Sequence, residues 1–279
     1  MGVSYNSLNK KAPRLSASLN PILFIRKEGY DASLKEINAA KKYFTVINNL
    51  DEVSSGENII GRFSLRPFYQ DIEKEIKNKN SDVLLPYEDF LYIEDIRRWY
   101  QDLKDFTPRT WSLGDDIDSD GPFFIKGITN SLKHEWDKSF VKNKDDLEKS
   151  IEGIKKNPLL ENQDIVIREY IPLRKLGESP KGMPISEEYR LFVLNSEVLV
   201  GGFYWSDYKN LIKDADWKKI PEDFIKQVIN KVPVRYYVLD IGIKEDGTPI
   251  VIELNDPGMS GLCDIDVDEF YKNLSQKLI

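Results

Sequence analysis

The chain has 279 residues, of which 41% are hydrophobic, so it is long enough to build a sizeable core in one large or two smaller domains. Its 40 basic and 47 acidic residues give a formal net charge of −7. The two signs are interspersed, with no basic stripe to follow a phosphate backbone, so nucleic acid is not an expected partner. One cysteine excludes an intramolecular disulfide, and one histidine leaves no Cys/His set for a zinc site.

Apolar runs such as Ile22 to Ile25 are much shorter than the roughly 20 residues of a membrane-spanning helix. The first residues also lack the apolar core of a signal peptide. We therefore expect a cytoplasmic protein that makes no membrane contact. A homodimer is left open as its oligomeric state.

Short apolar runs alternate with amphipathic segments in the first part of the chain. Strands are predicted at 22–25, 44–47, 58–61 and 83–85, and helices at 33–43, 69–77 and 88–103. This alternation favours an α/β unit with a mainly parallel sheet. Because proline disfavours helix in the residue before it, the unit is predicted to end near Thr107-Pro108, which gives domains of residues 1–107 and 108–279.

From Pro122 onward the predicted strands are longer and are joined by hairpin turns. They include 123–127, 165–171, 188–194 and 198–204, and helices are predicted at 145–155, 222–231 and 267–278. This part is predicted to be α+β, with mainly antiparallel sheets.

A hairpin near the C-terminus gives the sharpest local prediction. Asp246-Gly247 separates two apolar-rich runs and favours a two-residue type I′ turn. That turn pairs Lys244 with Pro249 and brings Asp240 opposite Glu253, with Asn255 two residues further along the same face. Leucine and isoleucine side chains then fall together on the opposite face, which is predicted to be core: Leu239, Ile241, Ile243, Ile250, Ile252 and Leu254.

Asp240 and Glu253 are thereby predicted to meet directly, and two facing carboxylates repel unless a cation lies between them. Two carboxylates with the Asn255 amide form an oxygen-only ligand set, which suits Mg²⁺ or Mn²⁺. The competing interpretation is that one carboxylate pairs with a lysine or arginine and the other faces water.

A second group of residues suits a polyphosphate. Lys126 lies in the apolar run Phe123 to Gly127 and needs an anionic partner there. The polar loop that follows, with Thr129, Asn130, Ser131 and Lys133, offers backbone amides and a second cation. The alternative is a surface hairpin whose lysines extend into water.

Two further strands carry candidate nucleotide contacts. The strand that ends in Arg168-Glu-Tyr-Ile171 has a backbone able to bind an adenine edge, and is otherwise a strand stopped by Pro172. Arg190 lies on one face with Glu188, where it either forms a salt bridge with that neighbour or donates to a transferring phosphoryl group.

Taken in order, Lys126, the 129–133 loop, Arg168 to Leu173, Glu188-Tyr-Arg190, Asp240 and Glu253-Leu-Asn255 resemble the ATP-grasp fold. They look most like its clade characterised by one N-terminal arginine and two lysines. The resemblance implies a pre-ATP-grasp domain followed by two α+β subdomains with ATP between them.

The resemblance also implies individual roles. Lys126 and Lys133 contact phosphates, Glu169 to Ile171 hold adenine, and Arg190 faces the γ-phosphate. Asp240, Glu253 and Asn255 hold Mg²⁺, with two ions expected. The N-terminal arginine is assigned to Arg62, which reaches the phosphate or a substrate carboxylate, in preference to Arg66.

The family chemistry is ATP-dependent ligation, in which a carboxylate attacks the γ-phosphate and an amine captures the acyl phosphate. The resemblance therefore implies an ADP-forming carboxylate–amine ligase for an amino acid or peptide. A phosphotransferase on the same fold and a nucleotide-binding module without turnover are the alternatives.

Overall fold

The computed structural model describes residues 21–25, 34–129, 131, 135–158, 160 and 163–278. The first sheet is parallel throughout, in the order β2-β1-β3-β4. Its strands are β1 (Ile22–Phe24), β2 (Thr45–Ile47), β3 (Asn58–Gly61) and β4 (Asp82–Val83). The helices of this part are α1 (Leu34–Ala40), α2 (Tyr69–Asn78), α3 (Tyr87–Glu94) and α4 (Ile96–Leu103), with a 3₁₀ turn η1 (Leu50–Glu52). The predicted alternation of strands and helices is confirmed.

The predicted helix 88–103 is two helices. Asp95 adopts an extended conformation, ends α3, and its side chain accepts a hydrogen bond from the backbone N–H of Arg97 at 3.0 Å. It is therefore the N-cap of α4. This break leaves Glu94 as the last residue of α3.

A small antiparallel sheet follows in the order β5-β8-β6-β7. Its strands are β5 (Thr110–Ser112), β6 (Phe123–Gly127), β7 (Phe140–Val141) and β8 (Ile165–Glu169). Helices α5 (Trp136–Ser139) and α6 (Leu147–Lys155) pack against it, and the 3₁₀ turn η3 (Lys144–Asp146) directly precedes α6. Its core is separate from the rest and includes Phe123, Ile125, Ile154 and Ile167.

The largest sheet is antiparallel, in the order β12-β11-β13-β14. Its strands are β11 (Glu188–Leu194), β12 (Glu197–Phe203), β13 (Tyr236–Ile243) and β14 (Pro249–Asn255). A hairpin of β9 (Lys175–Glu178) and β10 (Pro184–Ser186) precedes it, and η4 (Ser206–Leu211), η5 (Trp217–Lys219), α7 (Glu222–Lys231) and α8 (Val267–Leu278) complete this part. Asn195 and Ser196 both have positive φ, 53° and 64°, so the predicted two-residue turn between β11 and β12 is confirmed.

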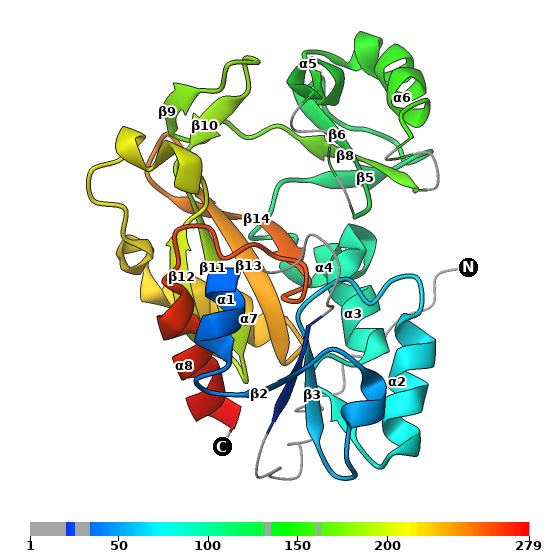
Figure 1. Cartoon of the computed structure of the whole chain (residues 1–279). Helices are drawn as coiled ribbons and strands as arrows, with labels where there is room; N and C mark the ends of the chain where they lie inside the picture. The colour runs from blue at the N-terminus through cyan, green and yellow to red at the C-terminus, as the bar shows by residue number, and fades with distance from the viewer. Residues whose placement is uncertain are drawn as a thin grey trace.

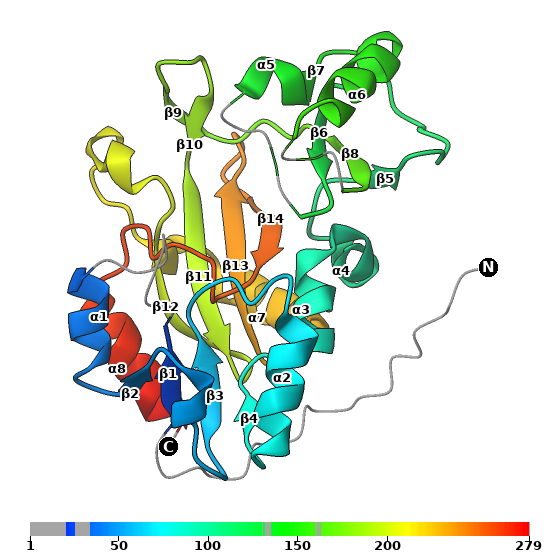
Figure 2. The same cartoon turned by 45° about the vertical axis from the view of Figure 1, so that its right-hand side comes forward.

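Helices cover both faces of the large sheet. Phe270 and Tyr271 of α8 pack in one core with Phe192 and Val238, and α1 lies beside α8, as Figures 1 and 2 both show. On the other face, α7 shares a core with Leu239 and Ile241. The small sheet with α5 and α6 projects from the end of the large sheet where β14 and the β9–β10 hairpin lie, opposite the N-terminal sheet (Figure 1).

The hairpin β13–β14 differs from its predicted register near the turn. The turn has three residues, Glu245 to Gly247, closed by the Lys244 and Thr248 pair, with Gly247 at a φ of 85°. Ile243 therefore pairs with Pro249, one residue out of the predicted register, until a bulge at Ile252 restores the pairing of Asp240 with Glu253.

The predicted core face of β14 was consequently wrong in part. Val251 is fully buried in the core with Leu239 and Leu254, whereas Ile250 and Ile252 are only partly buried. The predicted pairing of the two acidic residues is confirmed, although two opposite shifts produce it.

No helix among the residues that the structure describes is long and apolar enough to cross a membrane.

Candidate functional site

Lys126 of β6 forms an ion pair with Glu253 of β14, so it joins the small sheet to the large one. The lysine is only 4% exposed, and the glutamate side chain is 26% exposed. A buried lysine needs an anionic partner, and the structure confirms that prediction. The pair lies at the junction of the two sheets.

Arg190 and Asp240 are neighbours across β11 and β13, and they form a bidentate pair. Arg190 Nε donates to Asp240 Oδ1 and Nη2 donates to Oδ2, both at 2.8 Å. The Asn255 amide donates to the same Oδ2 at 2.9 Å, and the guanidinium lies 4.7 Å from the Tyr204 ring centroid. Burial alone lowers the pKa of Arg190, but the Asp240 carboxylate outweighs it and raises that pKa above its ordinary range.

The Glu188–Arg190 salt bridge that the sequence left open does not form. Glu188 is buried and accepts hydrogen bonds from the Ser186 hydroxyl at 2.9 Å and the Trp205 indole at 3.0 Å. Arg190 is instead committed to Asp240, which places one basic side chain directly beside the predicted metal ligands.

Asp240, Glu253 and Asn255 thus lie together on adjacent strands, as predicted, but each carboxylate has a basic partner from the protein. Among the described residues, no three aspartates, glutamates, histidines or cysteines gather as a ready-made metal site. The donor set still fits Mg²⁺ or Mn²⁺ chemically, because it offers two carboxylates and an amide oxygen and no sulfur or nitrogen ligand.

Arg168 is wholly internal. Its guanidinium donates to the Ile252 carbonyl at 2.8 Å and to the Thr107 hydroxyl at 2.7 Å, and Thr107 in turn donates to the Val251 carbonyl. Burial lowers the pKa of Arg168 to about 10. This side chain therefore connects β8 of the small sheet to the bulged segment of β14.

The predicted adenine segment, Glu169 to Ile171, begins at the last residue of β8. Glu169 pairs with Arg109 at 3.2 Å, and the Tyr170 ring packs against Phe140 at 4.9 Å between centroids. Ile171 is half-buried and lies outside the regular strands. The segment leaves the sheet as an irregular connection to β9, and the Tyr170 N–H donates to the Pro122 carbonyl at 2.9 Å.

The predicted phosphate loop is described only in part. Thr129 donates through its hydroxyl to the Glu94 carbonyl at 3.3 Å, and Ser131 is partly buried. Asn130 and Lys133 lie outside the described residues.

Arg62 does not extend toward Lys126 or Asp240. It is 4% exposed, donates through Nε to Glu36 at 2.7 Å, and donates through Nη1 to the carbonyls of Pro257, Gly258 and Ser260. It therefore holds the loop that follows β14 against α1.

Arg66 is the more exposed arginine of the same segment. Its side chain is 42% exposed, forms an ion pair with Glu94 at 2.6 Å, and stacks 4.9 Å from the Phe90 ring centroid. Burial raises the pKa of Glu94 to about 7, where Arg66 and Lys126 oppose the shift and Asp256 and Glu253 add to it. Glu94 thus lies within electrostatic range of the Lys126–Glu253 pair.

Sequence reasoning missed Glu94. In a single helix over 88–103, Glu94 is one of several charged residues along the helix and has no special position. Asp95, a residue type favoured as an N-cap, was a signal that a second helix begins there.

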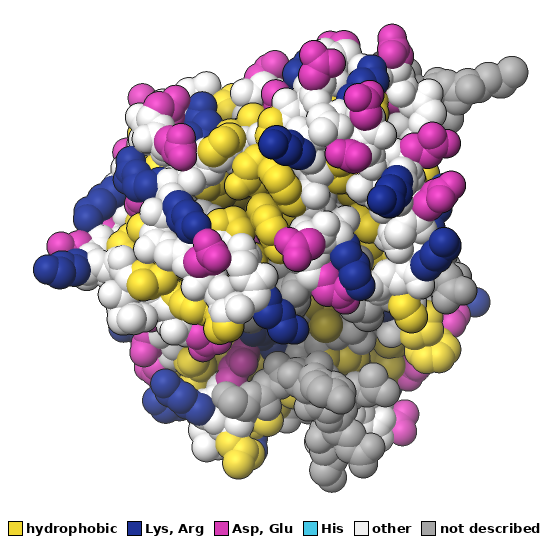
Figure 3. All heavy atoms as spheres, turned by 90° about the horizontal axis from the view of Figure 1, so that it is seen from above, with side chains coloured by type: hydrophobic (Ala, Val, Ile, Leu, Met, Phe, Trp, Pro, Cys, Tyr) yellow, Lys and Arg dark blue, Asp and Glu magenta, His cyan; other side chains and the backbone are white. Residues whose placement is uncertain are grey.

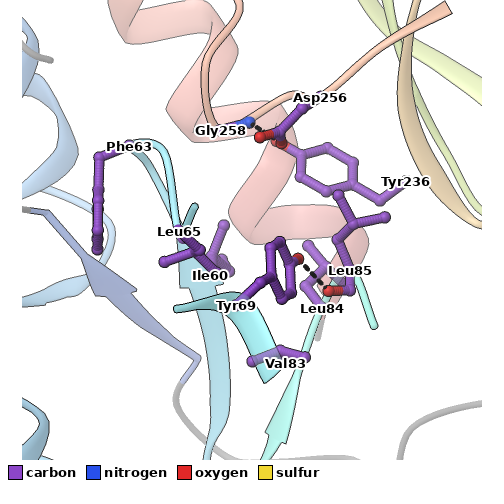
Figure 4. A pocket seen from close by; sticks show the side chains of 11 residues that line it. Ile60, Phe63, Leu65, Tyr69, Val83, Leu84, Leu85, Tyr236, Asp256 and Gly258 are labelled. Atoms are coloured by element: carbon purple, nitrogen blue, oxygen red, sulfur yellow. Dashed lines mark hydrogen bonds between the residues drawn. The ribbon is translucent and has the colours of Figure 1, made fainter. Parts of the chain in front are cut away.

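The loop after β14 closes a small cavity against the N-terminal sheet (Figure 4). Asp256 accepts the Gly258 N–H at 2.7 Å, and the Tyr69 hydroxyl donates to the Leu85 carbonyl on the other wall. The cavity volume is about 10 Å³, which is near the minimum room for one water molecule. It is too small for a substrate.

Figure 3 shows the face of the molecule that carries the small sheet and the β9–β10 hairpin. In Figure 3 hydrophobic side chains gather near the centre of this face, and lysines, arginines and acidic residues surround them. A mixed apolar and charged surface of this kind suits a nucleotide, which has an apolar base and a charged polyphosphate.

Solved structures that match this fold include several ATP-grasp proteins. The D-cycloserine synthetase DcsG matches with a TM-score of 0.56 and 12% identity, covering 88% of this chain and 94% of that chain. The ATP-grasp ligase PsnB, in complex with precursor peptide PsnA2 and AMPPNP, matches with a TM-score of 0.57 and 12% identity, covering 93% and 97%. An ATP-grasp RimK domain protein from Sphaerobacter thermophilus matches with a TM-score of 0.55 and 11% identity, covering 91% of this chain and 98% of that chain.

These likenesses establish the predicted fold class, a parallel N-terminal sheet followed by an ATP-grasp fold. A family model adds the closer assignment, because residues 112–274 match the ATP-grasp domain of family 3 in the clade named for one arginine and two lysines. The chain belongs to this family. The search of curated proteins found no match.

Arg62 provides a test of the brace between the N-terminal sheet and the loop after β14. Replacing Arg62 by Gln removes the buried guanidinium that pairs with Glu36 and binds three backbone carbonyls, so we expect a loss of about 3–5 kcal/mol in the free energy of unfolding, measured by urea denaturation. Arg98→Gln is the matched control, because its ion pair with Glu88 is 3.9 Å long and exposed. It should cost less than about 1 kcal/mol. Equal losses in the two variants would refute the brace.

Proposed function

We propose that this protein is a Mg²⁺- and ATP-dependent carboxylate–amine ligase that releases ADP and phosphate. The observation that carries the proposal is the adjacency of the Lys126–Glu253 and Arg190–Asp240 pairs, with Asn255 beside them, in a member of an ATP-grasp family. Two acids and two bases at one place provide for both a metal ion and the phosphates that it accompanies.

In this proposal, nucleotide binding replaces each of the two ion pairs by contacts to phosphate and metal. The Lys126 ammonium and the Arg190 guanidinium would transfer to phosphate oxygens, and the freed Glu253 and Asp240 carboxylates, with the Asn255 amide, would hold Mg²⁺. When bound there, Mg²⁺ neutralises charge on the polyphosphate. Lys133 and the loop of Thr129, Asn130 and Ser131 would add further phosphate contacts, and Glu169 to Ile171 would hold adenine.

The reaction follows from positioning of the two substrates. An oxygen of the substrate carboxylate attacks the γ-phosphorus, the bond from that phosphorus to the β-bridging oxygen breaks, and ADP leaves. The amine nitrogen then attacks the acyl carbon, phosphate leaves with the bonding pair, and the amine loses a proton. Arg190 would stabilise the transferring group through its fixed set of N–H donors.

The same proposal assigns the parts of the chain. Residues 1–107 form the pre-ATP-grasp domain and contribute to the substrate pocket, and residues 108–279 form the ATP-grasp domain. Arg168 acts by holding β8 against β14 rather than by touching ATP. The substrates are an amino acid or a peptide, and the structure of PsnB was solved with a precursor peptide bound.

Glu253 tests the metal assignment. We expect Mg²⁺ with the non-hydrolysed analogue AMP-PNP to raise the unfolding temperature of the wild-type protein, because a ligand that binds only the folded state stabilises it. In Glu253→Gln, which keeps the side-chain size but loses the charge, the Mg²⁺-dependent part of this rise should vanish. Glu245→Gln, in the exposed hairpin turn, should keep it in full. Undiminished protection of the Glu253 variant would remove Glu253 from the metal site.

Hydroxylamine separates the ligase from its alternatives. With Mg²⁺, ATP, pooled amino acids and short peptides, a ligase should release ADP, and hydroxylamine should capture the acyl phosphate as a hydroxamate. A stable phosphorylated product without hydroxamate would instead identify a phosphotransferase. Nucleotide binding with no ADP release from any pool would identify a binding module.

A further inference from the structure

Arg66 and Glu94 form an ion pair that the reaction described above does not use. Arg66 Nη2 lies 2.6 Å from Glu94 Oε2, and the guanidinium stacks on Phe90 of the same helix as Glu94. The two partners differ in accessibility, since the arginine side chain is 42% exposed and the glutamate side chain 14%. The pair therefore presents a positive edge to solvent over a largely buried carboxylate.

The pair lies where three parts of the molecule meet. The Thr129 hydroxyl donates to the Glu94 carbonyl, and the Ile96 N–H donates to the Ile128 carbonyl at 3.5 Å, so the end of α3 contacts the start of the predicted phosphate loop. Helix α3 also packs against β14, the strand that carries Glu253. Among the groups that act electrostatically on Glu94 are Arg66, Asp256, Glu253 and Lys126.

Arg66 differs from the other arginines near this place in what its donors contact. Arg62 donates to one carboxylate and three carbonyls, and Arg168 donates to a carbonyl and two hydroxyls, all inside the protein. Arg66 is the half-exposed one of these three, with a single carboxylate as its ion-pair partner in the described structure. A guanidinium has five N–H donors, so Arg66 retains donors for a ligand.

The charges of the pair select the ligand. An anion that bound Arg66 and displaced Glu94 would leave the Glu94 carboxylate buried without a cation, which costs free energy. A cation that bound Glu94 would in the same way remove Arg66 from its partner. A ligand with a single charge therefore loses part of its binding free energy to the partner that it displaces. A zwitterion avoids both costs, because its ammonium replaces Arg66 on Glu94 while its carboxylate replaces Glu94 on Arg66. All four charges then stay neutralised.

We infer that Arg66 and Glu94 bind the α-carboxylate and α-ammonium groups of a free amino acid substrate. The inference rests on the proposed ligase function and specifies its substrate class as an α-amino acid with both groups unblocked, rather than an internal peptide residue. The Phe90 ring forms one wall beside the carboxylate-binding guanidinium.

Binding tests the inference without requiring turnover. Protein saturated with Mg²⁺ and AMP-PNP is titrated calorimetrically with each of the common α-amino acids, and then with the N-acetyl and the carboxamide derivative of any that bind. We expect one or a few free amino acids to bind and each blocked derivative to bind at least tenfold more weakly, since each loses one charge-assisted contact.

Two variants then assign each group to its partner. Glu94→Gln should raise the Kd of the free amino acid at least tenfold, and the variant should bind the free amino acid and its N-acetyl derivative equally well. Arg66→Gln should raise the Kd of the free amino acid by a similar factor, and this variant should bind the free amino acid and its carboxamide equally well. A merely structural salt bridge predicts no such crossed pattern. Glu88→Gln, an exposed residue of the same helix, is the matched control and should keep the wild-type Kd. Circular dichroism verifies that each variant is folded.

The inference is overturned if no free amino acid binds, if blocked derivatives bind equally well, or if the variants weaken all ligands alike. These outcomes are separable from failure of the ligase function, because the hydroxylamine experiment with pooled peptides reports ADP release and hydroxamate independently of which substrate class binds.

Discussion

Pairing of acids on β13 and β14 with bases from other strands is the interaction on which the site depends. Asp240 and Glu253 lie opposite each other at adjoining strands, where two bare carboxylates repel. Arg190 relieves one charge from within the same sheet, and Lys126 relieves the other from the small sheet. The second pair therefore does two things at once, since it neutralises Glu253 and fixes the small sheet relative to the large one. A nucleotide with its metal ion offers the same charges in exchange.

Two buried arginines hold the surroundings of that arrangement in place. Arg168 connects β8 to the β14 carbonyl at Ile252, the residue that forms the bulge, and so supports the strand directly before Glu253. Arg62 connects α1 and the N-terminal sheet to the loop directly after Asn255. Both ends of the Glu253 to Asn255 segment are thus fixed by hydrogen bonds to backbone carbonyls. Both guanidinium groups are buried and donate to groups inside the protein, although from the sequence Arg62 was expected to reach a phosphate or substrate carboxylate and Arg168 to lie in the nucleotide-binding strand.

The local pattern of apolar and polar residues was sufficient to predict most helices and strands and the pairing of Asp240 with Glu253. The Asp246-Gly247 pair correctly located the hairpin, but the same dipeptide also permits a three-residue loop with glycine at positive φ, and that loop shifted the register by one residue. Alternation could not expose the shift, because β13 is buried on both faces and, apart from Asp240, carries no charged side chain on either face. The bulge at Ile252 then cancelled it. Neither event leaves a mark that a single sequence shows.

Contacts between distant segments lay beyond prediction. The sequence required an anion for Lys126 but could not choose Glu253, which is 127 residues away. The preference for Arg62 over Arg66 had no packing information behind it, since both lie in one short segment and only the packing of α1 and α3 decides which guanidinium is enclosed. The metal ligands, the phosphate-binding lysines and the adenine segment remain predictions from the sequence, and the structure adds the two ion pairs that the proposed nucleotide would replace.

The central claim is that Mg²⁺ and nucleotide replace the two internal ion pairs. A crystal structure with Mg²⁺ and AMP-PNP tests it most directly. The account predicts the Lys126 ammonium and the Arg190 guanidinium on phosphate oxygens, with metal density bounded by Asp240, Glu253 and Asn255. Bound nucleotide with both ion pairs intact, or metal held away from these three residues, would contradict it.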